Sequence, residues 1–157
     1  MNKIQLSDID LGSFGVILNK AGRVVNGVSQ GRMVYKGDGV YYKIFDKEYC
    51  RRDNFVKALE AGFFDEVAPA LKSLIVDGDD IVGYVTEAGE QLGSEFDRVP
   101  KPFYEKVLAC VDVTNMFFYD LVPSNIIMID GRLSLIDLES VYDLEELYTI
   151  DKHSAVV

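Results

Sequence analysis

Alternation of apolar and polar residues predicts short strands through the first half of the chain. Five apolar runs are separated by segments rich in glycine and polar residues, and they cover residues 23–28, 33–35, 40–45, 74–76 and 81–85. Period-two patterning bounded by turn formers is typical of antiparallel strands. The pattern therefore predicts a five-stranded antiparallel sheet in this half of the chain.

Helical periodicity appears in two places. The segment 49–61 places apolar side chains on one face and is followed by Gly62, a residue suited to the position beyond a helix end. A second helix is expected over about 102–118, where Pro100 and Pro102 favour a helix start. Its predicted apolar face comprises Phe103, Val107, Cys110 or Val111, and Phe117. The strand-rich half thus carries one helix, and the rest of the chain begins with another.

A connector rich in glycine and acidic residues, Glu87 to Arg98, separates the two halves. We therefore expect an N-terminal extension over residues 1–22, a strand-rich lobe over 23–88 and a second lobe over 89–157. The extension is predicted to contain a short helix at Leu6 to Leu11 and an edge strand at 16–18. The fold class is α+β.

Composition narrows the class of protein. A length of 157 residues fits one domain or one unit of two small lobes. Apolar residues make up 48% of the chain, which disfavours disorder, and no apolar run approaches the roughly 18 residues of a membrane span. The net charge of -10 would repel nucleic acid and anionic membranes. Two distant cysteines and one histidine argue against a zinc site, a disulfide framework and a Ser-His-Asp triad.

The pair Asp130-Gly131 lies between two apolar runs and predicts a tight β-hairpin. In a two-residue loop Ile129 faces Arg132, and this pairing fixes the register of both strands. The open end of the hairpin is therefore predictable residue by residue.

That register places Asn125 opposite Ile136, with Asp137 beside it. An amide carbonyl and a carboxylate suit a hard cation such as Mg²⁺, which fills its remaining positions with water and nucleotide phosphates. Asp120 precedes Asn125 by five residues and is expected at the same end of the hairpin, where it could act as a base. Each residue also has a plain structural interpretation as a turn former or strand cap.

The segment from Tyr119-Asp120 to Asn125 resembles the catalytic loop of the protein-kinase-like superfamily, and Asp137-Leu138-Glu139 resembles its metal-binding Asp-Phe-Gly segment. The resemblance covers about residues 23–140. It implies a bilobal fold, with the five-stranded antiparallel sheet and one helix in the first lobe and a strongly truncated helical second lobe. It also implies ATP and Mg²⁺ as cofactors, Asp120 and Lys43 as catalytic residues, and Asn125 and Asp137 as metal ligands.

By the same resemblance, Lys43 is similar to the third-strand lysine that holds the nucleotide phosphates, and Gly27 and Gly31 resemble the loop that covers them. Another glycine pair, Gly12 and Gly15, matches this loop better by letters. It lies too far before Lys43 for two short strands joined by a tight loop, so we favour Gly27 and Gly31.

The resemblance further implies an acidic partner for Lys43 on the first helix. Asp53 is our first choice and Glu60 the alternative. The hinge between the lobes is expected to bind the adenine edge through backbone N–H and C=O groups, which places Glu87 and Ala88 in the nucleotide site.

Several features depart from the family. Glu139 replaces the usual glycine, Tyr119 stands where arginine or glycine is commoner, and only 20 residues follow Asp137. The chain therefore resembles atypical small-molecule kinases and the minimal, effector-like kinases of bacteria. A truncated second lobe would expose apolar surface, which suggests self-association or a covering partner protein.

Three functions fit these residues. The leading one is transfer of the γ-phosphoryl group of ATP to a hydroxyl of a protein or small molecule. The alternatives are a pseudokinase that binds nucleotide or protein, and transfer of AMP in place of phosphate. The unpaired cysteines and the lack of a signal peptide indicate a cytoplasmic location, with a translocated effector as the alternative.

Overall fold

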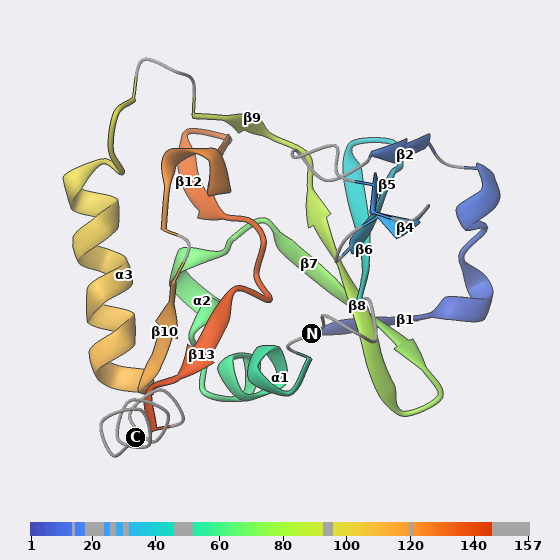
Figure 1. The fold of residues 1–157 in the computed structure, drawn as a ribbon, viewed down its shortest axis with the longest axis horizontal. Helices are drawn as coiled ribbons and strands as arrows, with labels where there is room; N and C mark the ends of the chain where they lie inside the picture. Colours follow the sequence, from blue (N-terminus) through green and yellow to red (C-terminus); the bar gives the residue numbers. More distant parts are fainter. Residues whose placement is uncertain are drawn as a thin grey trace. The chain divides into compact units, whose positions relative to one another are not determined.

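The computed structural model describes residues 1–13, 15–17, 24–25, 28–29, 32–45, 52–92, 96–119 and 121–145. The chain divides into two compact units (Figure 1). The first unit comprises Met1–Arg52 and Ala70–Ala88, and the second comprises Asp53–Pro69 and Gly89–Val157. One division falls between residues 88 and 89, within the connector. The helix that the sequence placed in the strand-rich lobe belongs to the second unit.

The first unit is built on a six-stranded sheet with the order β1-β7-β8-β6-β5-β2. Its strands are β1 (Asn2–Gln5), β2 (Gly15–Ile17), β5 (Arg32–Lys36), β6 (Val40–Phe45), β7 (Leu71–Asp77) and β8 (Asp80–Glu87). Strand β1 runs parallel to β7, and every other pairing in the sheet is antiparallel. A mixed α/β chain with a five-stranded antiparallel sheet is therefore present, with one further strand added in parallel.

Residues 1–22, predicted as an extension, supply both outermost strands of the sheet. Strand β2 corresponds to the predicted edge strand at 16–18, and β1 was not predicted. The predicted strand over 23–28 instead gives β3 (Val24–Val25) and β4 (Val28–Ser29), a separate two-stranded hairpin. The predicted helix at Leu6 to Leu11 is replaced by two 3₁₀ turns, η1 (Leu6–Asp8) and η2 (Leu11–Ser13). Local patterning cannot decide which of several short β-prone runs pairs with β5, because pairing depends on distant partners.

Strands β7 and β8 carry the core of the first unit. Leu74, Ile75, Tyr84 and Val85 are all at most 4% exposed. Gly83 lies opposite Ile44 in the register between β8 and β6, and a Cβ at this glycine would overlap the carbonyl oxygen of Lys43. The two strands can approach this closely only because position 83 lacks a side chain.

In its described residues the second unit combines helices with short strands. Its elements are α1 (Arg52–Glu60), α2 (Phe64–Val67), β9 (Glu90–Gln91), α3 (Lys101–Thr114), β10 (Met116–Phe118), η3 (Pro123–Asn125), β11 (Ile126–Ile129), β12 (Arg132–Leu135) and β13 (Val141–Asp143). Strands β9, β11 and β12 form one sheet, and β10 and β13 form another. The sequence did not predict α2, β9, β10 or β13.

The second predicted helix ends earlier than expected. Asn115 adopts the left-handed conformation with φ 60°, and its N–H donates to the carbonyl of Val111, which closes α3. Phe117, assigned to the helix by its periodicity, lies instead in β10 opposite Tyr142 of β13. Long-range strand pairing overrides the helical pattern here.

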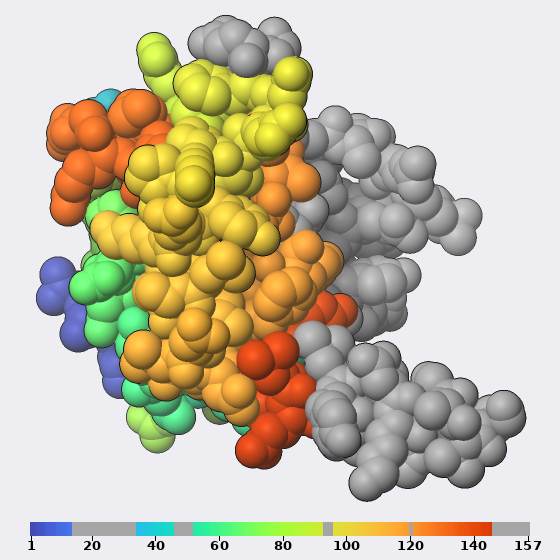
Figure 2. Space-filling model, turned by 90° about the vertical axis from the view of Figure 1, so that its left-hand side faces the viewer, coloured from blue at the N-terminus to red at the C-terminus, as the bar shows by residue number. Residues whose placement is uncertain are grey.

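Aromatic residues fill the core of the second unit. Phe55, Phe63, Phe64, Phe103 and Phe118 are all at most 6% exposed. The outer face of α3 (yellow to orange in Figure 2) retains exposed apolar side chains, with Tyr104 44% and Leu108 41% exposed. No helix within the described part of the chain is long and apolar enough to cross a membrane.

Candidate functional site

The predicted hairpin is present with the predicted register. Ile129 pairs with Arg132, and Ile126 pairs with Leu135. The turn residues Asp130 and Gly131 have φ values of 47° and 78°, as a two-residue hairpin turn of type I′ requires. The structure thus confirms the strand pairing on which the candidate metal site depends.

The open end of the hairpin brings Asn125 to the segment that precedes Asp137. The N–H of Ile136 donates to the carbonyl oxygen of Asn125 at 2.9 Å. Asn125 is the last residue of η3 and is only 9% exposed. Asp137 is partly buried and has a left-handed backbone with φ 65°, which is uncommon for a residue other than glycine. Strain of this kind is often found at functional sites.

A tight turn over residues 137–140 fixes the carboxylate of Asp137. The N–H of Ser140 donates to the carbonyl of Asp137 at 3.0 Å, and the Ser140 hydroxyl donates to Oδ2 of the same residue at 3.0 Å. Ser140 is 1% exposed, and Leu138 and Glu139 are also buried. One carboxylate oxygen of Asp137 is therefore held by a buried hydroxyl.

The candidate catalytic loop is tied to the same turn. Phe118 pairs with Val141 where β10 meets β13, and the N–H of Tyr119 donates to the carbonyl of Ser140 at 3.2 Å. The segment that leads into the loop and the segment that follows Asp137 are therefore neighbours. Asp120 itself lies outside the described residues.

The side chains at this site are chemically suited to Mg²⁺. Asn125 and Asp137 offer an amide oxygen and a carboxylate, both hard oxygen ligands. No group of three His, Cys, Asp or Glu side chains that could hold a metal occurs among the residues that the structure describes. A cation here would need water and phosphate oxygens to complete its coordination, which is how Mg²⁺ is usually held at nucleotide sites.

Lys43 lies in the middle of the first unit's sheet. It pairs with Val34 on β5 and with Tyr84 on β8. Its Nζ is 5.8 Å from the centre of the buried Tyr84 ring, within the range of a cation–π contact. The aliphatic stem and the charge of Lys43 are thus positioned by the neighbouring strand.

The candidate phosphate loop lies largely in a part of the chain that the structure does not describe. Gly27 and Gly31 lie outside the described residues. The strands β2 and β5 are direct neighbours, and the chain between them runs from residue 18 to residue 31 and includes both glycines. Gly12 precedes this connection, and Gly15 opens β2. The assignment of Gly27 and Gly31 to the phosphate loop stays a prediction.

Both backbone N–H groups of the predicted adenine contacts, Glu87 and Ala88, already have carbonyl partners. The N–H of Glu87 donates to the carbonyl of Ala70 at 2.8 Å, and the N–H of Ala88 donates to the carbonyl of Gly39 at 3.0 Å. Both amide donors are thus engaged in the first unit, because β8 continues its strand pairing up to the connector. Adenine binding by these two residues would be restricted to their carbonyl groups.

The acidic partner of Lys43 stays a prediction. Asp53 lies in the first turn of α1 and Glu60 in its last, and both side chains are solvent-exposed. Ser140, whose hydroxyl donates to Asp137, was not predicted. Its signal in the sequence is a pair of turn-forming residue types, Asp and Ser, close together after a strand.

Comparisons with known proteins give little guidance. No family model matches the chain, and no curated protein matches it. Among solved structures, "Co-crystal structure of WbdD and kinase inhibitor LY294002" aligns with a TM-score of 0.43 and 16% sequence identity. The alignment covers 79% of this chain and 34% of that chain, so this chain spans about a third of that protein's length. At this TM-score the likeness does not establish a shared fold.

Proposed function

We propose that the chain is a phosphotransferase that moves the γ-phosphoryl group of ATP to a hydroxyl acceptor, with Mg²⁺ as its metal. One observation carries the proposal. The N–H of Tyr119 bonds to the carbonyl of Ser140, and the N–H of Ile136 bonds to the carbonyl of Asn125. Both Asn125 and the segment before it are therefore tied to the stretch of chain that carries Asp137. In this proposal the amide oxygen of Asn125 and the carboxylate of Asp137 are the metal ligands, a choice that suits phosphate chemistry because a metal held by both could also bind the transferred group.

In this proposal Asp120 accepts the proton of the acceptor hydroxyl. The acceptor oxygen forms a bond to the γ-phosphorus, the bond from that phosphorus to the bridging oxygen breaks, and ADP leaves. Asn125 and Asp137 would hold Mg²⁺, and the charge of the ion would offset negative charge on the phosphate oxygens. Lys43 contacts the α- and β-phosphates and keeps them aligned for transfer.

A second candidate is a kinase-like module that binds a partner without turnover. The engaged N–H groups of Glu87 and Ala88 favour it, because they remove two donors expected to recognise adenine. The side chains of Asn125 and Asp137 favour the enzyme, since a module that only binds protein has no need of paired hard ligands.

The test uses the full chain with Mg²⁺ and ATP labelled at either the α- or the γ-phosphate. We expect γ-label to be released or to appear on the chain, and we expect Asp120→Asn to abolish this. The matched control is Asp130→Asn, because asparagine tolerates the positive φ of that turn and position 130 is at the opposite end of the hairpin. Incorporation of α-label would indicate nucleotidyl transfer. Binding of ATP without loss of either label would indicate the binding module.

A further inference from the structure

Three aromatic side chains, Phe117, Tyr119 and Tyr142, lie together next to the candidate catalytic loop, and we name them the aromatic corner. Phe117 is 36% and Tyr119 46% exposed, whereas Phe118 between them is 2% exposed. Successive side chains of a strand point to opposite faces, so Phe118 enters the core while Phe117 faces outward. The corner therefore leaves apolar ring surface exposed next to the buried core of this unit.

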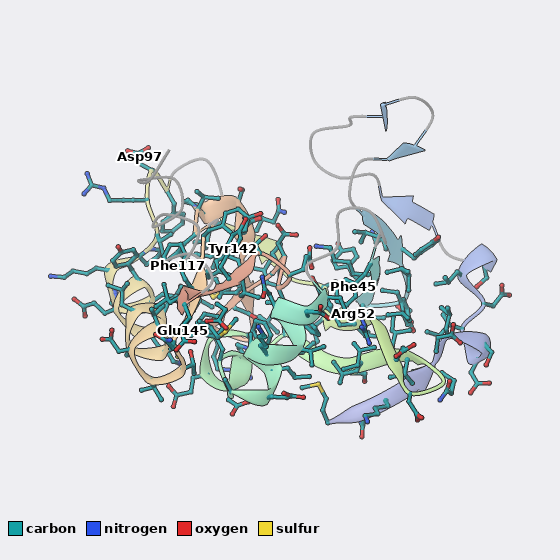
Figure 3. The ribbon with its side chains drawn as sticks, turned by 60° about the horizontal axis from the view of Figure 1, so that its bottom comes forward. Phe45, Arg52, Asp97, Phe117, Tyr142 and Glu145 are labelled. Atoms are coloured by element: carbon teal, nitrogen blue, oxygen red, sulfur yellow. The ribbon has the colours of Figure 1, made fainter. Side chains whose placement is uncertain are left out.

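Two rings of the corner, those of Tyr119 and Tyr142, contact each other at an angle. Phe117 is directly opposite Tyr142 in the pairing of β10 with β13, and Figure 3 shows these two side chains on neighbouring strands. The ring centres of Tyr119 and Tyr142 are 4.9 Å apart, with an angle of 59° between the ring planes. The two rings are thus in contact and form one continuous aromatic surface.

The charge around the corner favours a cation. Neither β10 nor β13 contains lysine or arginine, and the chain has a net charge of -10. Lys57 contacts this pair of strands, because its Nζ lies 3.5 Å from the carboxylate of Asp143. Strand alternation directs Asp143 to the face opposite that of Tyr142, so this ion pair does not lie on the face of the corner. Aromatic faces carry negative electrostatic potential and attract ammonium and guanidinium groups.

We propose that the aromatic corner binds a positively charged alkylammonium or guanidinium group of the acceptor. That this group belongs to the acceptor rests on the proposed phosphotransferase function, whereas the binding of a cation at the corner does not. The corner adjoins the site because the N–H of Tyr119 bonds to Ser140, whose hydroxyl holds Asp137. An acceptor anchored here by its charge would present its hydroxyl near the candidate loop. An amino alcohol and an arginine-containing peptide share this chemistry.

The test measures binding of a simple cation without nucleotide. Tetramethylammonium chloride and the neutral, similarly shaped 2,2-dimethylpropanol are titrated into the full chain, and the tyrosine ring signals are followed by NMR. We expect saturable shifts of Tyr119 and Tyr142 with the cation and binding of the alcohol weaker by about threefold to fivefold. Tyr142→Leu, which removes a ring, should weaken cation binding by about the same factor. Tyr142→Phe, which keeps the ring, should retain it.

Other outcomes would overturn the proposal. Equal binding of the alcohol would make the corner an apolar contact surface. Absence of saturable binding, or an unchanged affinity in Tyr142→Leu, would reject a cation site. Tyr119→Leu provides a second variant if Tyr142→Leu fails to fold, as judged by circular dichroism.

Competition then separates the two sources of the charge. Displacement of tetramethylammonium by 2-aminoethanol indicates a small amino alcohol, and displacement by the tripeptide Gly-Arg-Ser indicates a peptide. Failure of both to compete would reject the proposal. Because no ATP is present, a negative result here leaves the labelled-ATP experiment unaffected, and the reverse also holds.

Discussion

The N–H of Ile136 bonds to the carbonyl oxygen of Asn125 at 2.9 Å, one residue before Asp137 in the chain. This bond extends the hairpin pairing past the last pair of the ladder, Ile126 with Leu135. The bond therefore places Asn125 beside the residue that precedes Asp137. The hydroxyl of Ser140 donates to the carboxylate of Asp137.

Replacing Asp137 by Asn should remove the dependence of ATP binding on Mg²⁺. The side chain keeps its size but loses the charge that a hard divalent cation requires. We expect the affinity for ATP with Mg²⁺ to fall by about tenfold or more, and the affinity in EDTA to stay close to that of the wild type. Calorimetric titration in both conditions measures this. Asp130→Asn should match the wild type in both, and an unchanged response in Asp137→Asn would exclude Asp137 as a ligand.

Ser140→Ala should loosen the carboxylate of Asp137. The variant loses a hydrogen bond from a buried hydroxyl to a charged group, with an expected cost of about 1–3 kcal/mol in the free energy of unfolding. We also expect a higher Mg²⁺ concentration for half-maximal ATP binding, because Asp137 would be less well oriented. Ser134→Ala is the control, since its buried hydroxyl bonds to the carbonyl of Leu135 at 3.0 Å. Equal Mg²⁺ dependence in the two variants would show that Ser140 acts on stability alone.

Gly83→Ala should destabilise the first unit. The added Cβ would overlap the carbonyl of Lys43, so β6 and β8 must move apart. Overpacking of this kind typically costs about 1–3 kcal/mol, and urea unfolding should show a lower midpoint. At Gly12 the nearest atom to an added Cβ, Oδ1 of Asp10, would be 3.5 Å away, so Gly12→Ala should change stability by less than about 0.5 kcal/mol. A stable Gly83→Ala chain would mean that the strands tolerate separation at Lys43.

The thiol of Cys110 should react slowly in the folded chain. Burial raises the pKa of this thiol, the carboxylates of Glu66 and Asp65 raise it further, and Lys106 partly opposes them. Thiolate is the reactive form, so iodoacetamide labelling at pH 8 should be slower in the folded chain than in urea. The unfolded thiol loses its proton first, so the stability that this group contributes is present below the unfolded pKa and falls as pH rises. Cys50→Ser isolates the signal, and fast labelling of the folded chain would contradict the expectation.

The hairpin at Asp130-Gly131 shows what local sequence determines. Positive φ is required at both turn positions and Asp-Gly supplies it, so the register of β11 with β12 and the position of Asn125 opposite Ile136 follow without tertiary information. The strands β5 to β8 were predictable for a similar reason, because alternation and turn residues agree along each of them.

Pairing between strands that are far apart in the sequence determined the remaining elements. Residues 116–118 read as the end of a helix, yet they form β10 because β13 offers a partner far along the chain. The run at 23–28 was assigned to the main sheet but forms the separate hairpin of β3 and β4, since several short β-prone segments compete for the edge beside β5. Two further contacts depend on the same pairing of β10 with β13. They are the hydrogen bond from Ser140 to Asp137 and the ring contact between Tyr119 and Tyr142. The sequence by itself therefore determined the local turns and the candidate oxygen-bearing side chains, while only the tertiary structure decided what surrounds them, because strand pairing between remote segments has no local signature.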